Sequence, residues 1–125
     1  MKALLSIKPR FVEKIFNGEK KFEYRKVVFA RKNIKIVVVY ATMPVGKIVG
    51  EFSIEEILES TPSEIWAKTK DFSGVEKSFY DDYFEGRTKA FAIKIKDAVL
   101  YDIPINPYET ENKFTAPQSF SYIIH

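Results

Sequence analysis

The chain has 125 residues, of which 46% are hydrophobic and 15% aromatic, and this content excludes an intrinsically disordered protein. It contains no cysteine, which rules out disulfides and thiolate metal sites. The net charge of +3 is unevenly distributed: residues 1–47 hold 12 Lys and Arg against 3 Asp and Glu, and residues 48–125 hold 8 against 14. The basic part predicts an anionic partner such as RNA or a nucleotide, unless the two parts interleave in space.

The length fits one domain, and we expect a single domain over residues 1–125 without linkers or internal repeats. The longest apolar run, residues 36–41, is far shorter than the ~18 residues that a membrane span needs. The N-terminus lacks the long apolar region of a secretory signal. These features predict a cytoplasmic protein without a membrane partner.

The first third of the chain predicts a strand, a helix and a second strand. Residues 3–7 alternate between two faces, as a short strand does. Pro9 favours the start of a helix, and apolar residues with helical spacing continue until an Asn-Gly pair at residues 17–18. Residues 21–26 alternate again and predict the second strand.

The middle of the chain predicts two strands and then two helices. Residues 34–41 form a β-branched run that indicates a buried strand, and residues 47–57 indicate a long returning strand. Two capping boxes follow, in which a Ser or Thr side chain and a Glu three residues later cap a helix start. They predict helices over residues 61–70 and 73–84.

The last third predicts two more strands, over residues 89–96 and 99–105. The aromatic segment at residues 117–123 is expected to pack back on the core. Five or six strands with three helices predict an α+β fold. A rolled sheet or small barrel is favoured over a doubly wound sheet, because strands and helices do not alternate regularly.

The sequence lacks the common signatures of enzymes and cofactor-binding proteins. His125 is the single histidine, which argues against histidine triads and zinc sites. The chain has five glycines, and they form neither of the phosphate-binding motifs G-x-x-x-x-G-K-[ST] and G-x-G-x-x-G. We therefore expect no cofactor and no metal, and any chemistry must come from Lys, Glu, Asp, Tyr, Ser or Thr side chains.

Residues 18–26 contain the densest group of candidate functional side chains. A glycine turn delivers Lys20 to the start of a strand, which presents Glu23 and Arg25 on one face, with Cα atoms about 7 Å apart. The carboxylate would accept hydrogen bonds from base or amide N–H groups, and the two cations would bind oxyanions. The residues allow either a ligand-binding group or a solvated ion pair worth under ~1 kcal/mol.

Several short motifs occur in an order and spacing that extend over essentially the whole chain. They are residues 4–9, Gly18-x-Lys20-x-x-Glu23-x-Arg25, and residues 38–42, 50–52, 83–86, 92–95 and 117–123. Together they resemble the ASCH domain, a branch of the PUA-like superfamily. The resemblance implies a PUA-like, mostly antiparallel β-barrel flanked by short helices, and recognition of RNA or a nucleotide.

The resemblance also implies a cleft between residues 6–8 and residues 18–25. The ligand-binding candidates are Ser6, Lys8, Lys20, Glu23, Arg25, Tyr40 and Thr42. Of these, Tyr40 and Thr42 are chosen because strand ends often carry functional groups. Ser119 and Tyr122 are further candidates to close the cleft.

A bacterial relative in the superfamily hydrolyses acetylcytidine with a lysine and a threonine on this segment and a separate glutamate. Alignment on Gly18 and Arg25 puts that lysine on Lys20 but the threonine on Glu23. The position of the nucleophile is therefore not preserved, which argues against that hydrolysis here.

Three hypotheses of function follow. The leading one is a binding module that recognises RNA or a modified nucleoside or nucleotide through a basic cleft. The alternative is a small amidohydrolase acting on an acylated nucleoside, in which Lys20 is a general base or electrostatic stabiliser and Glu23 transfers protons. The third is a regulatory interaction module. We expect Lys20 and Glu23 to be partly exposed, so that removing either charge changes stability by only about 0.5 kcal/mol.

Overall fold

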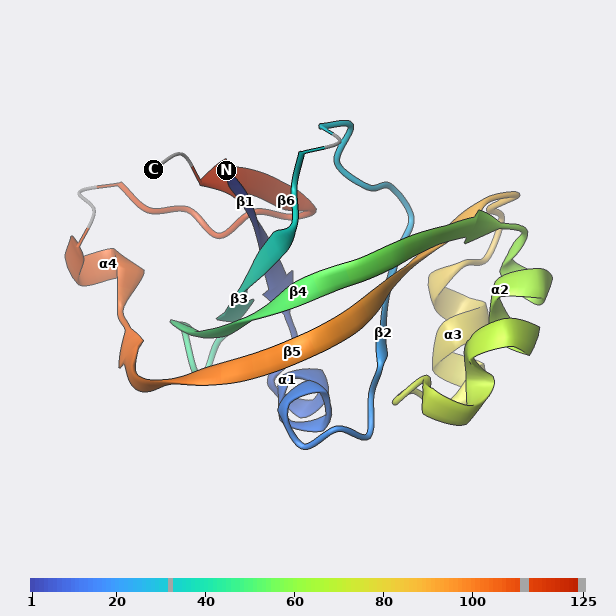
Figure 1. Cartoon of the computed structure of the whole chain (residues 1–125), viewed down its shortest axis with the longest axis horizontal. Helices are drawn as coiled ribbons and strands as arrows, with labels where there is room; N and C mark the ends of the chain where they lie inside the picture. The colour runs from blue at the N-terminus through green and yellow to red at the C-terminus, as the bar shows by residue number, and fades with distance from the viewer. Residues whose placement is uncertain (32, 111–112, 124–125) are drawn as a thin grey trace.

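The structure is a computed structural model that describes residues 1–31, 33–110 and 113–123; His125 lies outside the described residues. Its main feature is a six-stranded sheet in the order β2-β5-β4-β3-β1-β6 (Figure 1). The strands are β1 (Lys2–Ile7), β2 (Phe22–Arg25), β3 (Ile36–Ala41), β4 (Lys47–Ser60), β5 (Ala90–Ile105) and β6 (Phe120–Ile123). Only β1 and β3 pair in parallel within this sheet, so the predicted α+β fold with a mostly antiparallel sheet is confirmed.

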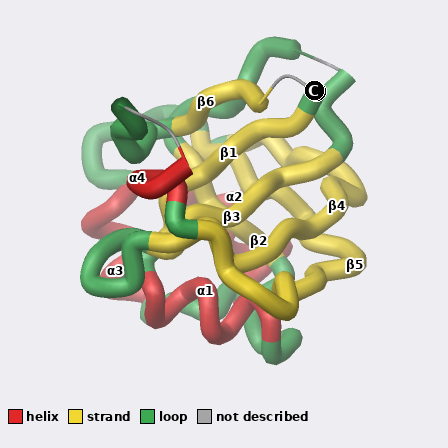
Figure 2. The backbone as a smooth tube through the Cα atoms, turned by 90° about the vertical axis from the view of Figure 1, so that its left-hand side faces the viewer, coloured by secondary structure: helices red, strands yellow, loops and turns green. Residues whose placement is uncertain are grey.

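The helices lie against the sheet and beyond one of its ends. They are α1 (Pro9–Phe16), α2 (Pro62–Thr69), a short 3-10 turn η1 (Lys70–Phe72), α3 (Lys77–Tyr83) and α4 (Pro107–Thr110). Helix α1 packs against β3 and β5 and lies below the sheet in Figures 1 and 2. Helices α2 and α3 lie side by side at one end, where the Tyr80 hydroxyl donates a 2.7 Å hydrogen bond to the Pro62 carbonyl. No helix in the described part of the chain is long and apolar enough to cross a membrane.

Strand β3 alternates between two buried clusters, as its β-branched sequence predicts. Val37 and Val39 face the main core, which includes Ile15 of α1. Val38 and Tyr40 face the opposite side, where residues of β1 and of the C-terminal segment cover them. The start of α1 follows directly after the end of β1 in the chain, and there the Arg25 side chain of β2 reaches the Ser6 carbonyl of β1.

The predicted barrel is not confirmed, because the sheet is open with β2 and β6 as its two edges. Strand β2 has only four residues and pairs with β5 alone, which leaves its outer side without a strand partner among the described residues. The predicted packing of the aromatic tail is confirmed, because β6 pairs antiparallel with β1.

Strand β5 runs unbroken over residues 90–105, where the sequence predicts two strands, over residues 89–96 and 99–105. Strand β5 pairs with β4 along most of its length, with shifts of register at three places. Asp97 has a positive φ of 52°, which is uncommon for a residue other than glycine, and it lies opposite the shift of register between Glu51 and Ser53 of β4. The two predicted strands are therefore one strand, because β5 pairs with β4 on both sides of Asp97.

The first of the two predicted capping boxes forms only in its Thr61 half, because the Glu64 carboxylate accepts from the Ser60 hydroxyl instead of the Thr61 N–H. The Thr61 hydroxyl accepts a 3.2 Å hydrogen bond from the Glu64 N–H, so α2 begins as expected. The second prediction is wrong, because α3 begins only at Lys77 and the Ser73 hydroxyl accepts from the Val75 N–H instead. Gly74 has a φ of 68° that a helix cannot contain, so residues 73–76 form a loop. This loop becomes one side of the candidate site.

Candidate functional site

A cavity of about 240 Å³ lies where the end of β1, the start of α1, strand β2 and helix α3 meet. Five of the seven sequence-predicted ligand-binding residues line it, and these are Ser6, Lys8, Lys20, Glu23 and Arg25. The volume is below the ~300–1,000 Å³ that is usual for pockets holding drug-sized ligands. The cavity therefore suits a small group, such as a single nucleotide.

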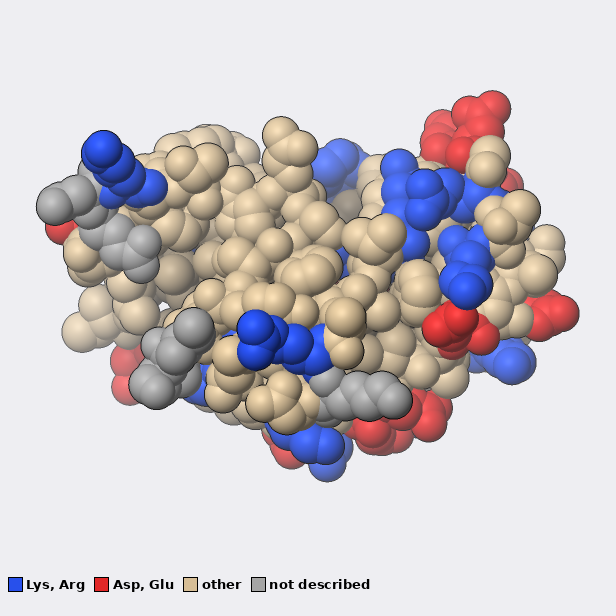
Figure 3. Space-filling view, turned by 90° about the horizontal axis from the view of Figure 1, so that it is seen from above, with Lys and Arg blue, Asp and Glu red and all other residues tan. Residues whose placement is uncertain are grey.

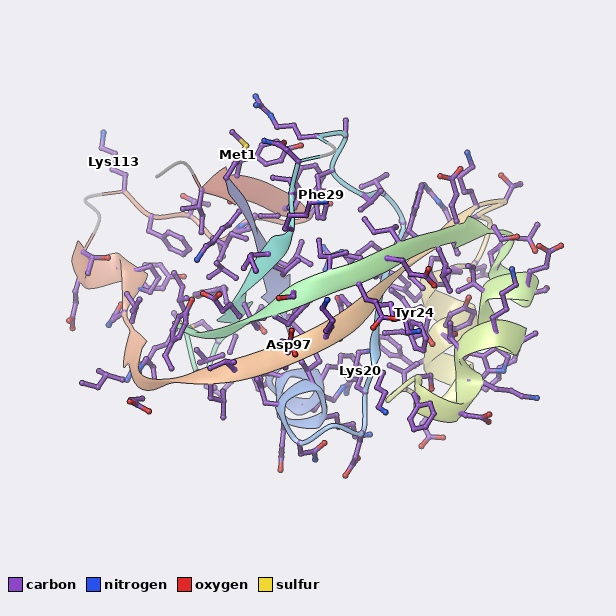
Figure 4. All side chains as sticks on the ribbon, in the orientation of Figure 1. Met1, Lys20, Tyr24, Phe29, Asp97 and Lys113 are labelled. Carbon is purple, nitrogen blue, oxygen red and sulfur yellow. The ribbon has the colours of Figure 1, made fainter. Side chains whose placement is uncertain are left out.

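Lys20 is held at the base of the cavity by its backbone and by its side chain. The turn after α1 places its N–H 3.0 Å from the Lys14 carbonyl, and Gly18 makes this turn possible with a φ of 89°. Its Nζ donates a 2.7 Å hydrogen bond to the Ser73 carbonyl and lies 4.7 Å from the centroid of the Tyr24 ring. Figure 4 shows Lys20 and Tyr24 between α1 and the α2–α3 pair.

The prediction that Lys20 and Glu23 are partly exposed is wrong. Lys20 is 2% exposed and Glu23 is 6% exposed. The loop of residues 73–76 covers the lysine stem, and Gly74 allows this close packing. A Cβ atom on Gly74 would lie 2.5 Å from the Lys20 Cβ, closer than two carbon atoms can approach. The sequence does not reveal this cover, because it comes from a loop about 50 residues further along the chain.

Burial changes the protonation of the lysine. Desolvation lowers the pKa of Lys20 to about 8, while the charge of Glu23 raises this pKa in part and Lys14 lowers it further. At neutral pH most molecules still carry the charged form. The cavity therefore contains a desolvated ammonium group that can lose its proton within one pH unit of physiological conditions.

Glu23 and Arg25 form an ion pair that is buried rather than solvated. The Arg25 Nη1 lies 3.3 Å from the Glu23 Oε2, and both side chains are mostly buried. The same guanidinium donates hydrogen bonds to the carbonyls of Ser119 at 2.6 Å and Ser6 at 3.5 Å. Arg25 thus connects β2 with the end of β1 and with the segment before β6. The Ser119 carbonyl thus contacts the cavity's arginine, but neither Ser119 nor Tyr122 lines the cavity itself.

An aromatic wall completes the cavity, and the sequence analysis did not assign it to the site. Phe11 of α1 packs edge-on against Phe79 of α3, with ring centroids 5.1 Å apart. Phe79 and Tyr83 lie one helical turn apart, with nearly parallel rings. Their i, i+4 spacing indicates only a packed helix face, and it gives no signal that this face lines a cavity.

Tyr24 also lines the cavity, although strand alternation puts it on the face opposite Glu23. Its hydroxyl donates a 2.7 Å hydrogen bond to the Thr69 hydroxyl, which in turn donates to the Ile65 carbonyl. Burial raises the pKa of Tyr24 to about 12, so this side chain stays neutral throughout the physiological range.

Tyr40 and Thr42 do not line the cavity. Tyr40 points to the other side of the sheet, where its hydroxyl shares a 2.6 Å hydrogen bond with that of Tyr108. The Thr42 N–H donates to the Ile7 carbonyl and so joins the ends of β3 and β1. The Tyr40 side chain and the helices that enclose the cavity therefore lie on opposite faces of the sheet.

The charges of the cavity favour an anion. Lys8, Lys20 and Arg25 carry three positive charges against the single negative charge of Glu23. Figure 3 shows Lys and Arg side chains interspersed with Asp and Glu side chains at the end of the molecule that carries α2 and α3. Among the residues that the structure describes, no group of three or more His, Asp or Glu side chains is placed to hold a metal ion.

Comparison with known proteins gives one family and several relatives. The model of the ASCH domain matches residues 5–98. A Zymomonas mobilis protein named "ASCH domain-containing ribonuclease" is 28% identical over 127 residues, which cover 97% of this chain and 83% of that protein. The crystal structure of ASCH from Zymomonas mobilis superposes with a TM-score of 0.90 and 28% identity, over 98% of this chain and 87% of that chain.

A second relative matches over only part of its own length. A Ureaplasma parvum protein named "Large ribosomal subunit protein uL22" is 34% identical over 121 residues, which cover 96% of this chain. The chain spans 38% of the length of that protein.

Proposed function

Because the chain belongs to the ASCH domain family, we propose that this domain binds unpaired RNA and receives one nucleotide in the cavity beside β2. The observation that carries the proposal is the convergence of Lys20, Glu23 and Arg25 on one small cavity with an aromatic wall. The name of the Zymomonas mobilis relative, aligned over 97% of this chain, supports RNA as the ligand.

The chemistry of the cavity fits a nucleotide. Lys20 and Arg25 supply charged donors for phosphate or carbonyl oxygens. Glu23 uses Oε2 in its ion pair with Arg25, so Oε1 is the atom that accepts an N–H from a base edge. Tyr83 and Phe79 offer aromatic surface to the base. A base pair would not fit a cavity of this size, which favours an unpaired nucleotide.

Fluorescence anisotropy with a labelled, unstructured RNA of nine nucleotides tests the proposal. Lys20→Met removes the charge and keeps the apolar stem, and it should weaken binding by 10-fold or more. Lys21→Met is the matched control, because it removes the neighbouring lysine, which is exposed and does not line the cavity. Equal affinities of the wild type and Lys20→Met for this RNA would overturn the proposal. Tighter binding of the same nonamer after annealing to its complement would overturn it as well.

A second candidate function is cleavage of the bound RNA. Two observations favour it: the lowered pKa of Lys20 beside Glu23, and the ribonuclease name of the Zymomonas mobilis relative. Glu23 would take the proton of a ribose 2′-hydroxyl, whose oxygen attacks the adjacent phosphorus. The bond from phosphorus to the 5′ oxygen then breaks, and Lys20 gives its proton to that oxygen. The products are a 2′,3′-cyclic phosphate and a 5′-hydroxyl end.

Mass spectrometry of the RNA after incubation separates the two candidates. Cleavage predicts a cyclic phosphate product that is lost with Glu23→Gln and with a 2′-O-methyl RNA, while the methylated RNA still binds. Glu19→Gln, an exposed carboxylate near the same turn, is the control. Intact RNA after incubation with the wild type would reject cleavage and leave the binding function standing.

A further inference from the structure

Cations lie at both ends of the aromatic row beside the cavity. At one end, the Lys8 Nζ and the Arg10 guanidinium each lie 5.2 Å from the centroid of the Phe79 ring. At the other end, the Lys26 Nζ lies 4.8 Å from the centroid of the Tyr83 ring. All three cationic side chains are exposed. Both rings line the cavity, so these cations border its mouth.

The two ends are separated along one helix. Phe79 and Tyr83 lie one turn apart on α3, with ring centroids 6.3 Å apart and planes within 8° of parallel. Arg87, just after α3, adds a cation at the second end, because its Nη2 donates a 3.4 Å hydrogen bond to the Lys26 carbonyl. The aromatic row therefore has one basic group at its Phe79 end, made of Lys8 and Arg10. It has a second basic group at its Tyr83 end, made of Lys26 and Arg87.

These cations differ from four other basic side chains on the surface, which a carboxylate neutralises. Lys2, Lys77, Lys89 and Lys94 each form a salt bridge with a carboxylate. Among the residues that the structure describes, Lys8, Arg10, Lys26 and Arg87 form none. An aromatic ring restrains a cation without neutralising its charge. Such a cation remains available to an anion and loses little further freedom when it binds one.

We propose that these two basic groups bind the phosphates on either side of the nucleotide in the cavity. The site then reads an internal nucleotide of an unpaired RNA strand, and a strand end or a free nucleotide can use only part of it. This inference rests on the proposed function, because it needs a nucleotide in the cavity, but it assigns separate residues to the flanking phosphates.

The test compares a nonamer RNA with a mixture of the four nucleosides, which carry no phosphate. Arg10→Gln and Lys26→Gln should each weaken nonamer binding several-fold and leave nucleoside binding unchanged. Each change should also make the slope of log affinity against log salt less steep by about 0.7, as loss of one single-strand phosphate contact does. Lys20→Met should weaken both ligands.

Lys21→Gln is the matched control, because the Lys21 Nζ also lies over an aromatic ring, 4.4 Å from the centroid of Phe72, but away from the cavity. Losses as large with Lys21→Gln as with Arg10→Gln would overturn the inference in favour of diffuse charge attraction. Unchanged nonamer binding by Arg10→Gln and Lys26→Gln would overturn it as well. If Lys20→Met still weakened binding, the proposed function would survive that result.

Discussion

The Lys20 ammonium donates its 2.7 Å hydrogen bond to the backbone carbonyl of Ser73, and not to a carboxylate. A backbone carbonyl orients the lysine without neutralising its charge. The charge is buried and faces a cavity, which costs stability when the cavity is empty. Such an arrangement is typical of a functional site, where a group is held ready for its ligand.

Removing the charge of Lys20 should make the stability of the domain less dependent on pH. The folded state lowers the pKa of Lys20 from 10.5 to about 8, so the unfolded chain binds this proton more tightly. The wild type should therefore gain stability relative to Lys20→Met between pH 8 and pH 10, by an amount on the order of 3 kcal/mol at most. Urea unfolding of both proteins at pH 7 and pH 9.5 measures this difference. If the free energies of unfolding of the wild type and Lys20→Met differ by the same amount at both pH values, that result would contradict the burial of the charge.

The close packing of Gly74 on Lys20 predicts a large effect of one methyl group. Gly74→Ala should destabilise the fold by about 2–3 kcal/mol, because it adds a clash with the lysine stem to the strain of a positive φ. Gly86→Ala is the control, since Gly86 has a φ of 77° with nothing within 4 Å of an added Cβ. It should cost only the backbone strain, about 1–2 kcal/mol. Thermal unfolding that showed equal losses for the two variants would mean that Gly74 does not pack against Lys20 in this way.

The buried ion pair predicts strong coupling between Arg25 and Glu23. Arg25→Met should destabilise the domain by about 3 kcal/mol, because it leaves the Glu23 carboxylate buried without its partner. Glu23→Gln in the same protein should restore part of that loss. A double-mutant cycle in urea measures the coupling. Additive effects of the two changes would show that the pair is solvated.

RNA affinity should depend on pH through Lys20. Affinity should fall as pH rises above about 8, because the ammonium loses its proton and with it the charge that attracts the RNA. Tyr24 stays neutral until about pH 12 and does not contribute to this change. Anisotropy with 2′-O-methyl RNA between pH 6.5 and 9.5 prevents cleavage from affecting the result. The same fall in Lys20→Met would assign it to another group.

The resemblance to the ASCH domain predicted a cleft between residues 6–8 and residues 18–25, and five of the residues named for it line the cavity. Alternation after the Gly18 turn placed Glu23 and Arg25 on one face, and the structure brings them to the same cavity as Lys20. The burial of Lys20 could not be predicted, because it depends on a distant loop. The capping-box pattern that starts at Ser73 predicted a helix where the structure has this loop.

The remaining differences have the same origin in long-range packing. The aromatic spacing of Phe79 and Tyr83 is the same for a core-facing helix and for one that lines a cavity. Tyr40 was predicted to be a site residue because it lies at a strand end. Its side chain instead packs on the face of the sheet opposite the main core. The open sheet follows from which strands pair at its two edges, and no local pattern predicts these long-range pairings.

Photocrosslinking locates the bound nucleotide and so tests the central claim most directly. An unstructured RNA that carries 5-iodouridine is irradiated with the wild-type protein, and the attached residues are identified by mass spectrometry. We predict adducts on the aromatic residues that line the cavity, above all Tyr83 and Phe79. Phe72 and Tyr108 are the internal controls, because they are 46% and 43% exposed and lie outside the cavity. Adducts on these two residues, with none on Tyr83 or Phe79, would contradict a nucleotide in the cavity.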